Sequence, residues 1–231
     1  METLILFLGV IIAIAFTIFI ENLRKSKLQI INISFIDKEY TNKYPAQNAR
    51  FLVVEIQNKP LPKFVKWMSR NPALHCHGYV SFHYMDGQNI FGRNMQLKWS
   101  DQPLPTTLWI QTNNEKIGIS NFQSSFNTID AFVGEKYKLD VAAKFDEDSE
   151  CYGWTYENEF SDPLWRNKNW KLKEGQYLVH ITIISSGEKC EEIFRLINSI
   201  QRTDFRLENR QSQDNVFQSK IFQKFKLNTG I

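Results

Sequence analysis

The pattern of apolar and polar residues divides the chain into three parts. An apolar run from Thr3 to Ile20 contains no charged residue. From Leu28 onward, short apolar runs rich in β-branched and aromatic residues alternate with polar turns, which is typical of an antiparallel β-sandwich. The pattern predicts a mainly β protein: a transmembrane anchor with a basic flank over residues 1–27, a sandwich over 28–199, and a short basic C-terminal tail over 200–231.

The N-terminal run has the length of an uncleaved membrane anchor. A helix over residues 3–20 would span about 27 Å, close to the thickness of a thin hydrocarbon core. A cleaved signal peptide is the alternative, but the run has no basic residue before it and no A-x-A site after it. We therefore expect residues 3–20 to cross a lipid bilayer once. Arg24, Lys25 and Lys27 follow the run, so the positive-inside rule places the N-terminus outside and the domain in the cytoplasm.

The expected strands follow from β-rich runs bounded by turn residues. They cover residues 28–36, 49–57, 74–85, 95–100, 106–112, 135–145, 176–185 and 190–198. Alternation in the third run predicts one row that faces the core: Cys76, Val80, Phe82 and Tyr84. The opposite row is His75, His77, Tyr79, Ser81 and His83. In the run 135–145 the same rule places Tyr137, Leu139, Val141 and Ala143 in the core and Lys136, Lys138, Asp140 and Lys144 in solvent.

One short motif carries a resemblance to known folds. Leu172, Gly175 and Tyr177 have the spacing of the tyrosine corner, and the segment resembles that of immunoglobulin-like and fibronectin type III-like sandwiches. The resemblance implies an immunoglobulin-like fold in which the hydroxyl of Tyr177 bonds to the backbone just upstream. The whole chain also resembles single-span prokaryotic membrane proteins with such a domain, and that resemblance implies no activity.

Composition and charge narrow the classes of function. The 42% apolar and 23% charged residues exclude a disordered chain, and the net charge of +3 is too small to indicate a nucleic-acid partner. Three widely spaced cysteines, Cys76, Cys151 and Cys190, form no C-x-x-C pair, which excludes a zinc ribbon. We expect them to be reduced and mostly buried.

The densest unusual feature is the aromatic segment over residues 151–170. If its rings are exposed beside the neighbouring amide and carboxylate groups, they could stack a sugar or grip a partner protein. The candidate ligand-binding residues are Tyr152, Trp154, Tyr156, Trp165 and Trp170. The alternative is that the tryptophans close one end of the core, because Trp usually serves packing.

Two further clusters allow metal binding by spacing alone. His75, His77 and His83 share one face of the expected strand, which permits a metal site and hence a metal-dependent enzyme. Asp146, Asp148 and Glu150 alternate as in calcium loops, but the run lacks the glycine and the register of an EF-hand. The sequence contains no recognisable catalytic motif, so we expect no cofactor and no resident metal.

Two basic segments with apolar residues could touch lipid. Residues 63–70 (KFVKWMSR) form a basic, aromatic loop between strands. In the tail, Phe217, Ile221 and Phe225 recur at helical spacing beside lysines, which predicts a short amphipathic helix suited to an anionic membrane face. A frayed or docked terminus is the alternative.

Together these patterns favour a membrane-anchored, non-catalytic binding module that recognises another protein. The alternatives are a carbohydrate-binding sandwich that uses the 151–170 aromatics, and a metal-dependent enzyme at His75, His77 and His83. Much of the preference depends on analogy with a fold that usually hosts binding.

Overall fold

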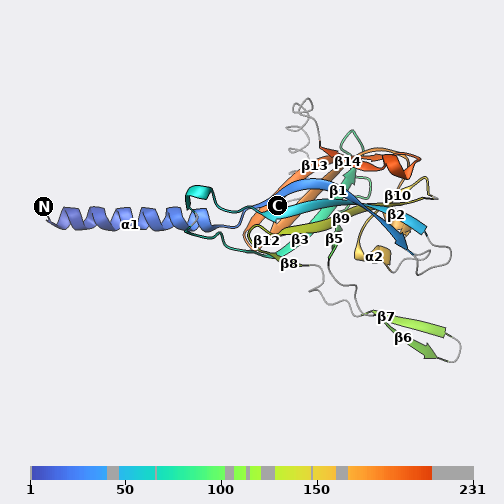
Figure 1. Cartoon of the computed structure of the whole chain (residues 1–231), viewed down its shortest axis with the longest axis horizontal. Helices are drawn as coiled ribbons and strands as arrows, with labels where there is room; N and C mark the ends of the chain where they lie inside the picture. Colours follow the sequence, from blue (N-terminus) through green and yellow to red (C-terminus); the bar gives the residue numbers. More distant parts are fainter. Residues whose placement is uncertain are drawn as a thin grey trace.

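The computed structural model describes residues 2–40, 47–65, 67–101, 107–112, 115–120, 128–146, 148–159 and 166–209. It has an N-terminal helix, α1 (Glu2–Arg24), followed by two antiparallel sheets (Figure 1). The stretch Phe7–Arg24 has a mean hydropathy of 1.9, and none of it is buried within the protein. By length and composition α1 therefore meets the requirements of a membrane span or of a signal sequence.

The first sheet has β1 at one edge. Its strand order is β1 (Leu28–Tyr40), β2 (Gln47–Asn58), β9 (Lys136–Phe145), β10 (Cys151–Gly153) and β11 (Lys171–Leu172), and β5 (Lys98–Trp99) also pairs with β9. The long strands match the expected runs because β-branched and aromatic residues fit the pleated, half-buried surface of a sheet.

The second sheet has β14 at one edge. Its order is β14 (Arg206–Asn209), β13 (Glu188–Asn198), β12 (Gly175–Ser185), β3 (Ala73–His83) and β4 (Met95–Gln96), and β8 (Ile129–Ala131) also pairs with β3. The predicted strand over 106–112 forms a separate hairpin instead, in which β6 (Thr107–Thr112) pairs with β7 (Glu115–Ser120).

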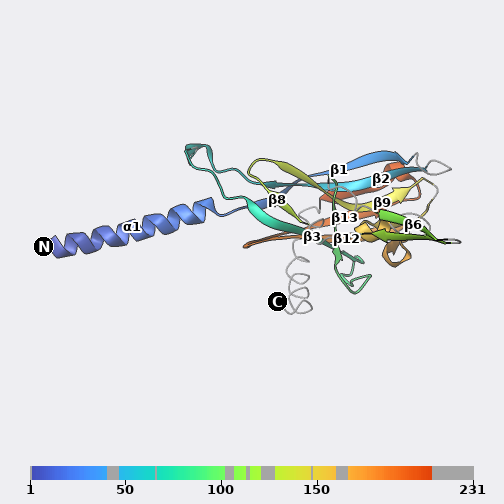
Figure 2. The same ribbon diagram turned by 90° about the horizontal axis from the view of Figure 1, so that it is seen from below.

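The two sheets lie face to face, with the core between them (Figure 2). The chain passes from one sheet to the other at Leu97, since β4 pairs with β3 and β5 pairs with β9. The connections that the structure describes contain the short helices η1 (Lys63–Val65), α2 (Tyr156–Glu159), η3 (Lys168–Trp170) and η4 (Arg202–Asp204).

Alternation predicts the faces of β3 only in part. Cys76, Val80 and Phe82 are buried in the core as expected. Tyr84 was expected in the core but is 47% exposed, because β3 ends at His83 and the chain turns there. His83 was expected to face solvent but is buried, since its ring bonds to the turn that follows β3.

The prediction for β9 is wrong in its second half. The register between β2 and β9 shifts at Leu52/Val53, which marks a β-bulge. A one-residue shift moves every later side chain to the other face of the sheet. Lys144 consequently points between the sheets and is 0% exposed, whereas Ala143 joins a second apolar cluster on the outer face.

The fold extends beyond the predicted domain boundary at residue 199. Strand β14 pairs with β13, and Phe205 and Leu207 are buried in the core. The described sheet therefore reaches Asn209. The rest of the predicted tail, including Phe217, Ile221 and Phe225, lies outside the described residues.

Candidate functional site

Three of the five candidate aromatic residues lie in the interior. Tyr152, Trp154 and Trp170 are each at most 5% exposed. Tyr156 lies in α2, but its side chain is outside the described part of the chain, as is all of Trp165. Tyr152, Trp154 and Trp170 are therefore not exposed stacking platforms, because the protein covers their rings.

The outer face of the first sheet explains why Trp154 is buried. Phe51 and Phe145 project from that face, and the ring of Trp154 packs edge-on against Phe51 with centroids 4.8 Å apart. Tyr152 packs against Phe145 in the same cluster. An apolar outer face needs a cover in water, and the segment after β10 supplies it.

Trp170 packs against the main core at one end. Its ring lies edge-on to Phe91 at 5.2 Å, and the guanidinium of Arg93 sits 4.3 Å from its centroid. Its indole nitrogen donates to Oε2 of Glu157 at 2.8 Å. A buried indole needs such an acceptor, so this contact serves packing.

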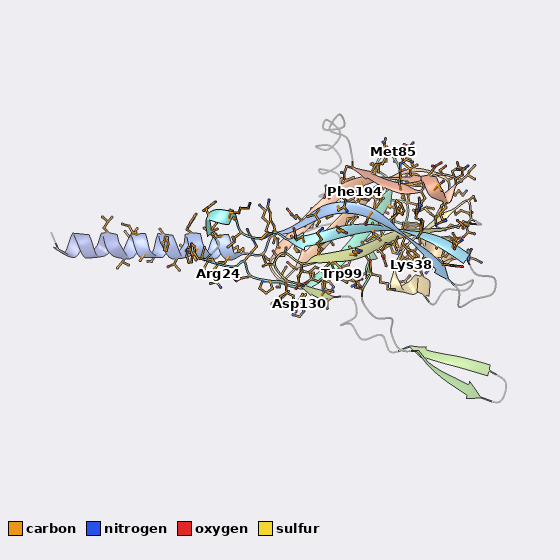
Figure 3. All side chains as sticks on the ribbon, in the orientation of Figure 1. Arg24, Lys38, Met85, Trp99, Asp130 and Phe194 are labelled. Carbon is orange, nitrogen blue, oxygen red and sulfur yellow. The ribbon has the colours of Figure 1, made fainter. Side chains whose placement is uncertain are left out.

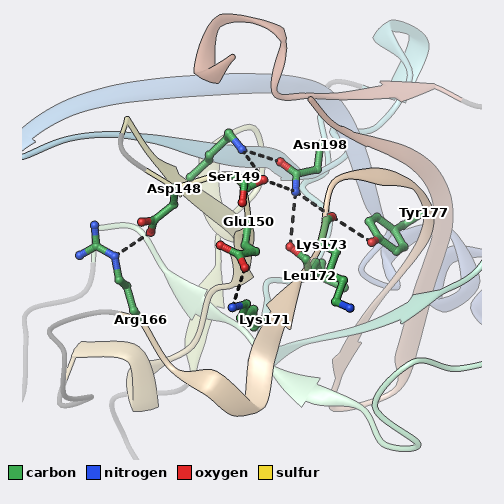
Figure 4. Close-up of polar contacts among 10 residues, drawn as sticks. Asp148, Ser149, Glu150, Arg166, Lys171, Leu172, Lys173, Tyr177 and Asn198 are labelled. Atoms are coloured by element: carbon green, nitrogen blue, oxygen red, sulfur yellow. Dashed lines mark hydrogen bonds and ion pairs between the residues drawn. The ribbon is translucent and has the colours of Figure 1, made fainter. Parts of the chain in front are cut away.

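A buried polar network joins the two sheets at this end (Figure 4). The Lys144 ammonium donates to the carbonyl oxygen of Ser149 and to Oδ1 of Asn198, both at 2.9 Å. Asn198 donates in turn to the carbonyl of Lys173 at 2.8 Å, which also accepts the hydroxyl of Tyr177 at 2.9 Å. The backbone bond predicted for Tyr177 is therefore confirmed. Burial lowers the pKa of Lys144.

The acidic turn after β9 forms ion pairs with three separate cations. Asp146 pairs with Arg202, Asp148 with Arg166 at 2.6 Å, and Glu150 with Lys171 at 2.6 Å. The bond from Lys171 holds the pKa of Glu150 below its usual value. These carboxylates diverge toward different partners, so the turn does not assemble the convergent oxygens that calcium requires.

The three histidines do not form one cluster. His75 has a positive φ of 52°, at an irregularity where β3 meets β8, and its backbone bonds to Asp130. His83 is buried, and its ring nitrogens contact Gly87 and Ser81. Among the residues that the structure describes, no three His, Cys, Asp or Glu side chains gather as a metal site.

The cysteines have the environment of structural thiols. All three are free, and both Cys76 and Cys151 are fully buried. Burial raises the pKa of Cys76 and of Cys190 to about 11, and it raises that of Cys151 further. Protonated, enclosed thiols are poor nucleophiles.

A shallow hollow lies between β1 and β13. It has a volume of about 210 Å³ and is lined by Ile30, Ile31, Asn32, Ile33, Glu192, Phe194 and Asn209. At the first residues of β1 and β13 a hydrogen bond joins the two strands, in which the backbone nitrogen of Leu28 donates to the carboxylate of Glu188. Beyond the bulge at residues 30–32, no strand within the described ranges pairs with the free edge of β1.

Glu192 is the unusual side chain of this hollow. It lies in the row of β13 that includes Phe194 and Leu196, so it points toward the gap between the sheets. Although the residue is exposed at the surface, the walls of the hollow desolvate its carboxyl and raise its pKa. It forms no hydrogen bond or ion pair with any residue that the structure describes. We take the free edge of β1 with Glu192 as the candidate site.

Sequence reasoning missed this site. The signal that could have found it is a glutamate in an otherwise apolar row of the strand over 190–198, formed by Cys190, Phe194 and Leu196. The second half of the site, the edge of β1, depends on which strands become neighbours in space. Searches against protein-family models, curated proteins and solved structures each found no significant match to this chain.

Proposed function

We propose that this chain is a membrane-anchored, non-catalytic β-sandwich that binds an extended segment of another protein along the free edge of β1. The observation that carries the proposal is this edge, which lies beside an acidic side chain without a partner among the described residues. An unpaired strand edge presents backbone donors and acceptors that an added strand can satisfy.

The strand order supports an immunoglobulin-like sandwich as the scaffold. Taken in chain order, β1, β2, β3, β5, β9, β12 and β13 correspond to the seven strands A to G. Strands β1, β2, β9 and β5 then form an ABED sheet, and β3, β12 and β13 a CFG sheet. The bond of Tyr177 at the start of β12 lies where a tyrosine corner occurs in that fold.

The chemistry of the hollow defines the partner segment. Ile31 and Ile33 offer apolar contacts, and the Glu192 carboxylate offers a charge-assisted bond to a cation. A cationic side chain would lower the raised pKa of Glu192 and so gain binding energy. We therefore propose a segment in β conformation that places a Lys or Arg opposite Glu192.

The anchor and the compartment are part of the same proposal. In it, α1 spans the bilayer once, with the N-terminus outside. Arg24, Lys25 and Lys27 at the end of α1 support a cytoplasmic domain by the positive-inside rule. Such a tether would restrict the sandwich to partners at the membrane surface.

Site-specific photo-crosslinking of the full chain in its membrane tests the proposal. A photoreactive residue is placed at Ser34 on the edge of β1, or at Thr182 on the solvent face of β12 as a control. We expect one discrete adduct from Ser34 and none from Thr182. The charge reversal Glu192→Lys should abolish the adduct, because it repels the cationic side chain of the partner.

The neighbouring reversal Glu191→Lys is the matched control. Glu191 points to the opposite face, where it pairs with Lys189 at 2.8 Å. The Ser34 adduct should therefore survive Glu191→Lys. An adduct that is unaffected by Glu192→Lys, absent in a stably anchored protein, or formed between two copies of this chain would contradict the proposal.

A further inference from the structure

The connection between β2 and β3 is fastened to the end of α1. The backbone nitrogen of Lys59 donates to the carbonyl of Lys27 at 2.8 Å. At the other end of the connection, the nitrogen of Asn71 donates to the carbonyl of Arg24 at 2.6 Å, and Arg70 donates to the carbonyl of Lys25 at 2.5 Å. We call the described residues 59–65 and 67–72 the η1 loop.

The η1 loop extends back beside the last turns of α1. Both ribbon views show η1 next to the end of the helix rather than over the sheets (Figures 1 and 2). A helix that crosses the bilayer from Phe7 to Arg24 rises about 27 Å, so its last turn reaches the boundary of the hydrocarbon core. The loop therefore lies at the depth of the lipid head groups when α1 is inserted.

Two aromatic side chains of the loop point away from the protein. Phe64 is 81% exposed and Trp67 is 73% exposed. Val65, which follows Phe64 in η1, is buried. Leaving a large apolar ring in water costs about 2 kcal/mol relative to burial. The outward rings thus require a partner, and Trp is the residue most typical of the membrane interface.

The charges around the rings favour a lipid surface. Residues 59–72 contain Lys59, Lys63, Lys66 and Arg70 but no Asp or Glu. Basic residues next to an anionic leaflet are attracted to its phosphates. Three more apolar side chains are exposed at the same end of the sandwich, at the start of β3, the end of β8 and the end of β12: Leu74, Phe132 and Ile184.

We propose that the η1 loop is a second membrane contact, in which Phe64 and Trp67 insert into the head-group boundary of the bilayer that α1 spans. This inference rests on the transmembrane anchor of the proposed function. The occupant is lipid because the helix itself brings the bilayer to the loop. Two points of attachment, the helix and the loop, then fix the tilt of the sandwich on the membrane.

Quenching of tryptophan fluorescence by brominated lipids tests this contact. The full chain is reconstituted in nanodiscs of phosphatidylcholine and phosphatidylglycerol, with or without brominated acyl chains. The signal of Trp67 is the difference between the wild type and Trp67→Phe. We expect brominated lipid to quench this difference signal at least twofold, and Phe64→Asp to weaken the quenching by opposing insertion of the loop.

The matched control moves the exposed indole to the other end of the domain. Tyr84 is half-exposed beyond the end of β3. Its neighbour in the chain, Met85, lies far from Arg24 at the end of α1 (Figure 3). In the double variant Trp67→Phe, Tyr84→Trp, the new indole should not be quenched. Equal quenching at both positions would contradict a specific contact.

Two failures are distinguishable in this experiment. A chain that does not migrate with the nanodisc has no inserted α1, which overturns both the anchor and the loop contact. A chain that migrates with the nanodisc but whose Trp67 signal is unquenched overturns the loop contact alone.

Discussion

The ammonium of Lys144 on β9 donates a 2.9 Å hydrogen bond to the side-chain oxygen of Asn198 at the end of β13. This bond connects the two sheets, and a bulge in the first sheet makes it possible by turning Lys144 inward. The same asparagine bonds to the carbonyl that accepts the hydroxyl of Tyr177. The hydroxyl of Tyr177 and the buried lysine thus belong to one polar network (Figure 4).

Removing the side chain of Asn198 should destabilise the fold. The variant Asn198→Ala leaves the buried ammonium of Lys144 with the carbonyl of Ser149 alone, and we expect a loss of about 3 kcal/mol in the free energy of unfolding. Urea unfolding of the detergent-solubilised chain, followed by fluorescence, measures it. Lys144→Met combined with Asn198→Ala should cost less than the sum of the single changes, since the two groups interact directly. Additive losses would indicate that the bond is not formed.

Tyr177→Phe isolates the contribution of the Tyr177 hydroxyl, which donates to the carbonyl of Lys173. The ring stays in place, and the carbonyl of Lys173 keeps its bond from Asn198, so we expect a loss of about 1 kcal/mol. The urea midpoint reports it. Tyr84→Phe removes a hydroxyl from a half-exposed ring and should leave the midpoint unchanged.

Trp154 and Trp67 should respond to removal of the ring in different ways. Trp154→Ala removes a 1% exposed ring from the outer cluster and should destabilise the fold by about 4 kcal/mol. Trp67→Ala removes an exposed ring and should change the free energy of unfolding by less than about 0.5 kcal/mol. Loss of ligand binding in a fully stable Trp154→Ala protein would instead favour an exposed binding platform.

His83, which is buried, and His180, whose side chain is 11% exposed, should make the domain sensitive to mild acid. Burial lowers the pKa of His83 and of His180 below the ordinary value of 6.5. Between the folded and unfolded pKa values the unfolded chain binds more protons, so stability is full above pH 6.5 and falls as the pH drops below it. Three carboxyls have lowered pKa values, and their contribution to stability is lost only at more acidic pH: Asp37, Glu150 and Glu208.

Denaturation at a series of pH values between 5 and 7 measures this effect. His180→Gln should flatten the slope, whatever its effect on stability at pH 7. His75→Gln, a substitution of the same kind at an exposed position, is the matched control. A slope that His180→Gln does not alter would show that another group is responsible.

The thiols should resist modification in the folded protein. With the pKa of Cys76 at about 11 and that of Cys151 raised further, the thiolate is scarce at pH 8, and both side chains are enclosed. We expect alkylation of these two residues to require unfolding in urea, as read by mass spectrometry. Rapid labelling of native Cys76 would contradict its burial.

The long strands and the backbone bond of Tyr177 could be predicted because their signals are local. β-rich runs bounded by turns predicted β1, β2, β3, β9, β12 and β13. The spacing of Gly175 and Tyr177 predicted a backbone bond that the structure contains. These patterns depend only on residues that are near one another in the chain.

The errors arose where distant segments meet. The sequence could not reveal the bulge that inverts Lys144, since the bulge is set by pairing with β2. It could not reveal that Trp154 would find an apolar outer face around Phe51. The candidate site was missed for the same reason. Glu192 becomes part of a hollow only because β13 lies beside β1 in the folded protein.

Strand β14 and the buried ring of Phe205 have a consequence for biosynthesis. The helix α1 leaves the ribosome first, while the last core strand ends only at Asn209. At translation rates of about 5–20 residues per second, roughly 10–40 s separate the two events. During that interval the nascent, incomplete sandwich would carry open strand edges, which are prone to aggregate until β14 is added.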